Sequence, residues 1–142
     1  MDERADTSDA VATSPPARAI EADWQWRWRM ALAIVARCDL AALGIVAIYL
    51  IGSTKEATAG PGSDIDLLIH YDGAADHRVR IESYLDGWSQ ALAEWNHERT
   101  GLQLAGLVEP HLITDADIAA RTSFAAMIDS CTNRARLLRK RD

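Results

Sequence analysis

Residues 49–69 read YLIGSTKEATAGPGSDIDLLI, and this stretch decides the predicted fold. An apolar run ends at Gly52-Ser53, and ten residues later Asp64 and Asp66 open a second apolar run. Because residues i and i+2 of a strand point to the same face, we expect the two carboxylates to lie on one side of a sheet. Hard divalent cations prefer oxygen ligands of this kind. The stretch therefore predicts two strands, a glycine-rich loop between them, and a metal site where the second strand begins.

The loop itself is suited to binding phosphate. A glycine at position 52 lets the backbone approach a ligand closely. The N–H groups of Ser53 and of a short helical turn, which we expect over residues 54–59, can then cradle phosphate oxygens. Lys55, one of two lysines in the chain, can neutralise a departing pyrophosphate, although an exposed loop lysine is the alternative. Ser63 is a further candidate for phosphate binding.

The bulk composition fits one acidic domain. The chain has 142 residues, of which 49% are hydrophobic, and this is enough for one packed core. The net charge of −6 argues against general nucleic-acid binding, which requires a basic face. The acidic N-terminus does not resemble a signal peptide, and no apolar run approaches the roughly 20 residues of a membrane helix. Cys38 and Cys131 lack metal-site spacing and predict free thiols, so we expect a cytoplasmic protein without membrane association.

A disordered tail and three helices complete the predicted organisation. Residues 1–16 are polar and end in two prolines, so we expect a disordered tail, and residues 17–142 are expected to form the domain. Apolar residues recur at helical spacing over residues 17–37, 76–98 and 115–138, so we expect helices there.

Basic residues gather near the C-terminus, at Arg134, Arg136, Arg139, Lys140 and Arg141. We interpret them as the end of the third helix, where cations suit the helix dipole; contact with a nucleotide, an RNA or a partner is the alternative.

The first predicted helix is rich in tryptophan. Its apolar residues fall on two stripes, Trp24, Trp28, Leu32 and Val35 on one and Trp26, Met30 and Ala33 on the other. Large aromatic side chains mostly bury, which favours packing against the sheet. The functional alternative is an exposed Trp26 that stacks on a base or docks a partner. This helix is also the candidate interface for a homodimer.

The Gly-Ser, spacer and Asp-x-Asp pattern resembles the nucleotidyltransferase superfamily, which has the polymerase-β-like fold. The resemblance covers about residues 40–118 and implies an α+β fold with a small mixed β-sheet flanked by helices. The ten-residue spacer is similar to that of minimal bacterial members, which include antitoxin-type modules and antibiotic-modifying enzymes. The sequence over residues 87–118 resembles a narrower group, a nucleotidyltransferase domain associated with phosphoenolpyruvate-synthase-like proteins.

The resemblance also implies a third carboxylate on a later strand, and Glu109 matches it. Two-metal chemistry needs such an acid to orient the acceptor and to hold the second metal. A glutamate in place of the usual aspartate, followed by Pro110, departs from the family pattern, and a surface role for Glu109 is the alternative. Pro110 restricts Glu109 to extended backbone, and we expect residues 102–108 and 111–113 to form one or two strands broken by Pro110. His111 faces the same side as Glu109 and can contact phosphate or a carboxylate, or serve structure alone.

The activity implied by the resemblance is magnesium-dependent nucleotidyl transfer. Asp64, Asp66 and Glu109 would hold two Mg²⁺ or Mn²⁺ ions, and a nucleoside triphosphate, most simply ATP, would donate its nucleoside monophosphate. The acceptor would be a hydroxyl of a small molecule or a protein, with release of pyrophosphate. Two alternatives remain open at this point. One is an antitoxin-like module that binds a helical partner protein, and the other is a nucleotide-binding vestigial domain that serves a phosphotransfer enzyme.

Overall fold

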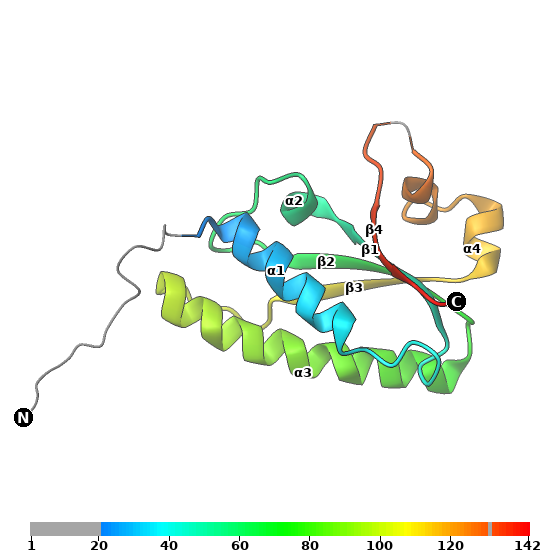
Figure 1. Cartoon of the computed structure of the whole chain (residues 1–142), viewed down its shortest axis with the longest axis horizontal. Helices are drawn as coiled ribbons and strands as arrows, with labels where there is room; N and C mark the ends of the chain where they lie inside the picture. Colours follow the sequence, from blue (N-terminus) through cyan, green and yellow to red (C-terminus); the bar gives the residue numbers. More distant parts are fainter. Residues whose placement is uncertain (1–20, 131) are drawn as a thin grey trace, which may run out of the picture.

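A four-stranded mixed sheet forms the centre of the structure (Figure 1). The structure is a computed structural model that describes residues 21–130 and 132–142, so the predicted tail over residues 1–16 and the Cys131 thiol lie outside the described residues. The strands are β1 (Ile45–Ile51), β2 (Ile65–Tyr71), β3 (Val108–Ile113) and β4 (Arg136–Lys140), arranged in the order β3-β2-β1-β4. Strand β1 runs antiparallel to β2 and β4, whereas β2 and β3 are parallel.

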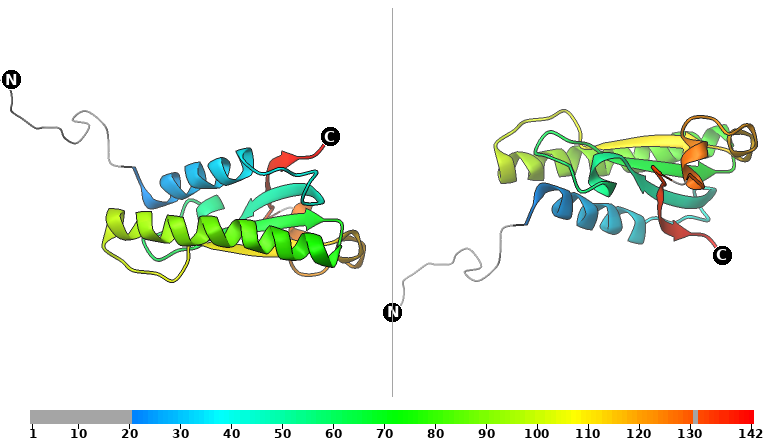
Figure 2. Two further views of the ribbon diagram at one scale, coloured as in Figure 1. Left: turned by 90° about the horizontal axis from the view of Figure 1, so that it is seen from below. Right: turned by 90° about the horizontal axis from the view of Figure 1, so that it is seen from above.

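Helices cover the sheet unequally. The helical elements are α1 (Asp23–Ala36), α2 (Gly52–Lys55), α3 (Ala75–Thr100), α4 (Asp115–Ala120) and the 3-10 helix η1 (Ala125–Ile128). The two long helices, α1 and α3, pack on one face, and Figure 2 shows them side by side. The predicted α+β fold, a small mixed sheet flanked by helices, is confirmed. In the described part of the chain, every helix is too short or too polar to cross a membrane.

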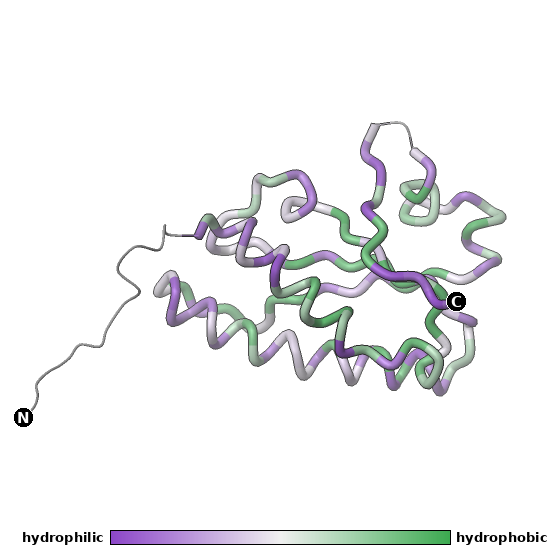
Figure 3. Tube along the Cα trace, in the orientation of Figure 1, coloured by the Kyte–Doolittle hydropathy of each residue, from purple (hydrophilic) through white to green (hydrophobic). Residues whose placement is uncertain are grey.

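Strand β2 buries side chains on both faces of the sheet. Ile65, Leu67 and Ile69 belong to the large cluster under α1 and α3, whereas Leu68 belongs to a smaller cluster on the opposite face, with Ala125 of η1. Figure 3 shows hydrophobic residues concentrated along these central strands. Because side chains alternate along a strand, Asp66 shares the face of Leu68, away from the two long helices. That face is the less covered one, and it leaves room for a site.

Helix α1 buries a different stripe from the one that is richest in tryptophan. The buried side chains are Trp26, Arg27, Met30, Ala31, Ile34 and Val35, which recur at i, i+4 and i+8. The other predicted stripe is only partly covered: Leu32 is 46% exposed, Trp24 and Trp28 are half-buried, and Val35 is buried. Core packing of Trp26 is therefore correct, and the alternative of an exposed Trp26 that stacks on a base is wrong.

The two strands around the motif and the second helix agree with the sequence. Strands β1 and β2 lie on either side of the glycine-rich loop, as the sequence predicts, and α3 extends the predicted 76–98 by one residue at its start and two at its end. Gly101 ends α3 in the left-handed region, at φ +79°. Helix α2 begins at Gly52, two residues before the turn predicted over residues 54–59.

Two predictions beyond residue 100 are wrong. Strand β3 runs unbroken through Pro110, and residues 102–107 form no strand. Proline is tolerated there because β3 lies at the edge of the sheet, where one side of the strand has no ladder to complete. The helix predicted over residues 115–138 also does not exist as one element. Thr114 and Asp117 cap α4 as a capping box, but Arg121 adopts φ +52° and ends it after six residues.

The basic C-terminal residues lie in and around a strand, which corrects their interpretation as a helix end. Strand β4 pairs with the free edge of β1, with Leu50 opposite Arg136 and Ile48 opposite Arg139. Arg139 Nη1 donates to the carbonyl oxygens of Val35 and Cys38, at 2.8 Å each, and so ties the strand to the end of α1. Burial raises the pKa of the Cys38 thiol to about 11, which keeps it protonated.

Candidate active site

Parallel pairing of β2 with β3 brings the predicted carboxylates together. Asp66 lies directly opposite Glu109 in the register, and Leu68 lies opposite His111. One ligand atom each of Asp66, Glu109 and His111 lie within 4.8 Å of one another. Asp64 precedes the strand and lies close enough to Glu109 for the two charges to interact. The sheet thus assembles all three predicted acids from residues that are far apart in the sequence.

Gly52 forms the wall of the site on the β1 side. Its backbone has φ +75°, and a Cβ added there would lie 2.5 Å from Asp66 Oδ2. The position therefore requires glycine both for its conformation and for its closeness to the carboxylate, a contact that the sequence did not predict. Ser53 follows in the first turn of α2, and its carbonyl oxygen accepts from Thr58 N at 2.9 Å. Next to it, the Thr54 hydroxyl is buried and has no partner within the described residues, 21–130 and 132–142.

His111 links the acids to an aromatic ring. His111 Nε2 lies 3.2 Å from Asp66 Oδ1, and the imidazole stacks on Phe124 with ring centroids 4.2 Å apart. Phe124 is 41% exposed, so it borders the site from the segment between α4 and η1. The sequence pattern gave no sign of this contact, because Phe124 falls in the region that was predicted as one long helix.

Ser63 and Lys55, the other predicted phosphate contacts, have protein partners in this structure. Ser63 Oγ accepts from Gly60 N at 2.9 Å and closes the turn before Asp64. Lys55 Nζ donates to the carbonyl oxygen of Arg134 at 2.8 Å and forms an ion pair with Glu56. The amine thus links α2 to the segment that directly precedes β4.

The matched family agrees with this geometry. Residues 34–118, more than half of the chain, match the profile of the family described as nucleotidyltransferase domain. The chain belongs to that family. It is therefore a nucleotidyltransferase, an enzyme of nucleotidyl transfer, and the match contains the Gly-Ser pair, the Asp-x-Asp pair and Glu109.

One solved structure can be set beside this nucleotidyltransferase. It is a proposed nucleotidyltransferase from Sulfolobus solfataricus, with 16% sequence identity over 83% of this chain and 84% of that chain, and a TM-score of 0.43. No curated protein matches the chain significantly.

In this nucleotidyltransferase, the surroundings of Asp64 and Asp66 disfavour the charged form of both carboxyl groups. Partial desolvation raises the pKa of the Asp64 carboxyl, and repulsion from Glu109 raises it further, whereas Arg27 lowers it. Desolvation also raises the pKa of Asp66, against the hydrogen bond from His111, which lowers it. Carboxylates crowded in this way repel one another unless a cation lies between them.

The donor set fits a hard divalent cation. Carboxylate oxygens of Asp66 and Glu109 are ligands that Mg²⁺ and Mn²⁺ accept, and His111 adds a nitrogen that Mn²⁺ accepts more readily than Mg²⁺ does. Asp64 lies beside this cluster and interacts with Glu109. Asp64 and Glu109 are exposed while Asp66 and His111 are half-buried, so the cluster is open to solvent on one side. An open side is what a metal site needs if a substrate is to complete the coordination.

The raised pKa values predict an unusual dependence of stability on pH in the absence of metal. Because the folded-state pKa values of Asp64 and Asp66 lie above 3.8, the native state binds more protons than the unfolded chain in the window above that pH. Both groups therefore contribute stability that is lost as pH rises through their folded-state pKa values. At pH 7 with EDTA, we expect the double variant Asp64→Asn/Asp66→Asn to melt at a higher temperature than the wild type, with a difference that shrinks at low pH.

Excess Mg²⁺ should reverse that order, because the cation binds and stabilises only the protein that keeps its carboxylates. Melting curves by circular dichroism at several pH values, with EDTA or Mg²⁺, measure both effects. A double variant that is less stable than the wild type at pH 7 in EDTA would contradict the electrostatic account.

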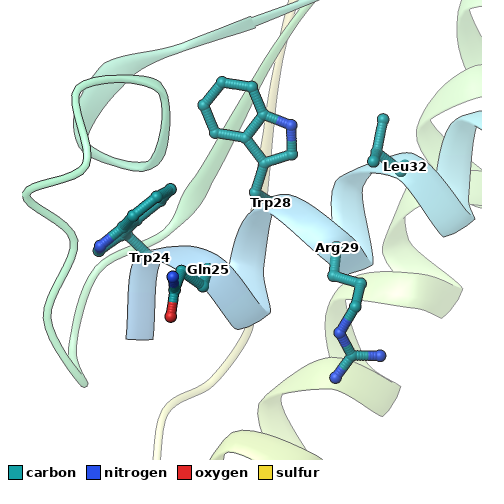
Figure 4. A pocket seen from close by; sticks show the side chains of 5 residues that line it. All are labelled: Trp24, Gln25, Trp28, Arg29 and Leu32. Carbon is teal, nitrogen blue, oxygen red and sulfur yellow. The ribbon is translucent and has the colours of Figure 1, made fainter. Parts of the chain in front are cut away.

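A shallow hollow lies on the outer side of α1, away from the acids. Trp24, Gln25, Trp28, Arg29 and Leu32 line it, and Figure 4 shows their side chains along one side of the helix. The rings of Trp24 and Trp28 meet edge to face, with centroids 6.3 Å apart. The hollow lies on the helix that the sequence indicates as a candidate interface, and of its apolar residues Leu32 is exposed while Trp24 and Trp28 are half-buried.

Proposed function

We propose that the chain is a magnesium-dependent enzyme that transfers a nucleoside monophosphate, AMP from ATP, to a hydroxyl group. The observation that carries the proposal is the assembly of Asp66 opposite Glu109 on adjacent strands, with Gly52 against the Asp66 carboxylate. Family membership supports nucleotidyl transfer in general, and the acids with their glycine wall support a metal-bound triphosphate as the donor.

Each residue has a distinct task in this proposal. Asp64, Asp66 and Glu109 would hold the cations, and Glu109 would also orient the acceptor. The backbone N–H groups at Gly52 and Ser53 donate to the β- and γ-phosphates. His111 fixes the orientation of the Asp66 carboxylate through its hydrogen bond. The bound cations neutralise phosphate charge and lower the pKa of the acceptor hydroxyl.

Lys55 and Ser63 complete the phosphate site in this proposal. Lys55 Nζ would exchange its contacts with Glu56 and Arg134 for the departing pyrophosphate. Ser63 keeps the turn closed and presents its hydroxyl near the acids. Both tasks concern charge and position, since phosphoryl transfer asks little covalent chemistry of the protein.

The reaction is an in-line displacement at the α-phosphorus. The acceptor oxygen forms a bond to phosphorus while the bond from phosphorus to the bridging oxygen breaks, and pyrophosphate leaves with the electron pair. The proton of the hydroxyl passes to the Glu109 carboxylate, which is exposed and can meet an acceptor from solvent. The acceptor in this proposal is a small molecule or a protein that carries a hydroxyl group.

Thermal stability with each nucleotide tests the proposal. The wild type and Asp64→Asn/Asp66→Asn are melted with ATP, GTP, CTP or UTP, with and without Mg²⁺. A ligand at 100 times its dissociation constant stabilises by about 2.7 kcal/mol, and we expect this shift with ATP and Mg²⁺ in the wild type only. Release of pyrophosphate with candidate acceptors then measures turnover. Binding without turnover would favour a nucleotide-sensing domain, and no shift with any nucleotide would overturn the proposal.

A further inference from the structure

Arg27 is the only fully buried charged side chain in the part of the chain that the structure describes. Its guanidinium donates from Nε to the Ser63 carbonyl at 2.9 Å and from Nη2 to the Pro61 carbonyl at 3.0 Å. Nη2 also donates to Asn96 Oδ1 at 2.9 Å, and Nη1 to the Asp23 carbonyl at 3.4 Å. A buried cation is costly unless hydrogen bonds satisfy it, and here two of those bonds go to one short loop.

Asn96 holds the same loop from the other long helix. Its side chain is fully buried on α3, and Nδ2 donates to the Pro61 carbonyl at 2.9 Å. The Pro61 oxygen therefore accepts from both Arg27 and Asn96. Figure 2 shows the start of α1 and the end of α3 at the same end of the molecule. There Arg27 Nη2 donates to Asn96 Oδ1. Two helices thus clamp the turn of residues 60–63 from the closed face of the sheet.

The clamped turn leads directly into the metal-binding acids. Ser63, whose carbonyl accepts from Arg27, is bonded to Asp64, and Asp66 follows two residues later. The loop has no regular ladder of its own here, because β2 begins only at Ile65. Without the buried hydrogen bonds, the position of Asp64 would depend on an exposed turn of Gly60, Pro61 and Gly62.

We propose that Arg27 and Asn96 are positioning residues that fix the turn of residues 60–63 and thereby set Asp64 and Asp66 for the metal ions. The inference rests on the proposed function, since it assigns a purpose to the geometry of that same site. A buried ionic group can often be replaced by apolar residues without loss of stability, so stability alone does not call for an arginine at position 27. The planar fork of Arg27 reaches two loop carbonyls and an amide at once, and a lysine amine cannot copy that geometry.

The test compares Arg27→Lys with Arg29→Lys in titrations of Mn²⁺ followed by electron paramagnetic resonance. Both changes keep the charge, but Arg29 is exposed on the same helix and pairs with Glu21 outside the site. We expect Arg27→Lys to weaken Mn²⁺ binding by about 10- to 100-fold, the size usual for groups that orient metal ligands. Hydrogen exchange in the metal-free protein should also accelerate at residues 60–66. Arg29→Lys should change neither measurement.

Two further variants separate positioning from simple loss of stability. Ile34→Val removes a methyl group from the buried face of the same helix and lowers the melting temperature without touching the loop, so its affinity for Mn²⁺ should match the wild type. Asn96→Asp keeps an acceptor for Arg27 but loses the donor to Pro61, and it should weaken Mn²⁺ binding even if Arg27→Lys fails to fold. If Arg27→Lys and Asn96→Asp fold and keep wild-type affinity for Mn²⁺ and wild-type hydrogen exchange, the inference is wrong, but the proposed function is not affected. A wild type that binds no Mn²⁺ would overturn the proposed function with it.

Discussion

Asp66→Asn is expected to lower kcat/KM for nucleotidyl transfer by about three orders of magnitude. The charge of Asp66 faces both Glu109 and His111, so its loss removes a ligand from the centre of the metal cluster. A metal ion contributes several kcal/mol of charge stabilisation in the transition state, and each 1.36 kcal/mol is a factor of ten in rate. Asparagine keeps the shape and can still accept from His111, so the fold should survive. Pyrophosphate release under saturating Mg²⁺ measures the effect.

The matched control is Asp115→Asn. Asp115 also pairs with a histidine, since its Oδ1 lies 2.7 Å from His70 Nε2, but its side chain is 91% exposed and stands outside the cluster. This substitution should leave kcat/KM within about twofold of the wild type, because Asp115 lies outside the acid cluster, and the loss of an exposed pair should lower stability by at most about 1 kcal/mol. Transfer by Asp66→Asn at the wild-type rate would mean that the acids are not the catalytic site.

Gly52→Ala is expected to reduce nucleotidyl transfer by about 100-fold and to destabilise the protein as well. The new Cβ would lie 2.5 Å from Asp66 Oδ2, so either the α2 turn or the carboxylate must move. A displacement of about 1 Å can cost about 100-fold in rate. The left-handed backbone at φ +75° adds about 1–2 kcal/mol of strain for any residue other than glycine. Steady-state kinetics and urea denaturation measure the two effects.

Gly60→Ala provides the comparison within the same loop. A Cβ at Gly60 meets no atom within 4 Å, and its backbone lies outside the left-handed region. The substitution should therefore leave stability within about 1 kcal/mol of the wild type and keep the activity. If Gly52→Ala kept the stability and the activity of Gly60→Ala, the close contact between Gly52 and Asp66 would not be needed for function.

The central part of the fold was readable from the sequence because its signals are local. Branched apolar runs bounded by Gly52-Ser53 and by the turn after Tyr71 fix the bounds of β1 and β2. The region after Thr114 was not readable, because Phe124, Met127 and Ile128 have helical spacing although no continuous helix forms. Strand β4 exists because the edge of β1 is available to it, and pairing across the sheet leaves no trace in the local pattern.

The candidate site divides in the same way. Asp64, Asp66 and Glu109 were found because acids at the start of an apolar strand stand out in a family pattern. Phe124 was missed because its partner His111 belongs to a distant element. Arg27 was missed for another reason. It is one of thirteen arginines and sits two residues from the exposed Arg29, so composition and spacing cannot show which of the two turns inward.

The place of β4 has a consequence for the growing chain on the ribosome. Strand β1 is synthesised before β2, α3 and β3, but its outer edge is covered only when residues 136–140 have emerged. Until then the nascent chain presents an Ile-rich strand with unpaired N–H and C=O groups, which is a template for joining another chain. Any release of the peptide before Arg136 would leave that template permanently open. The open edge of β1 is therefore a site where nascent chains can aggregate, until the basic strand closes the sheet.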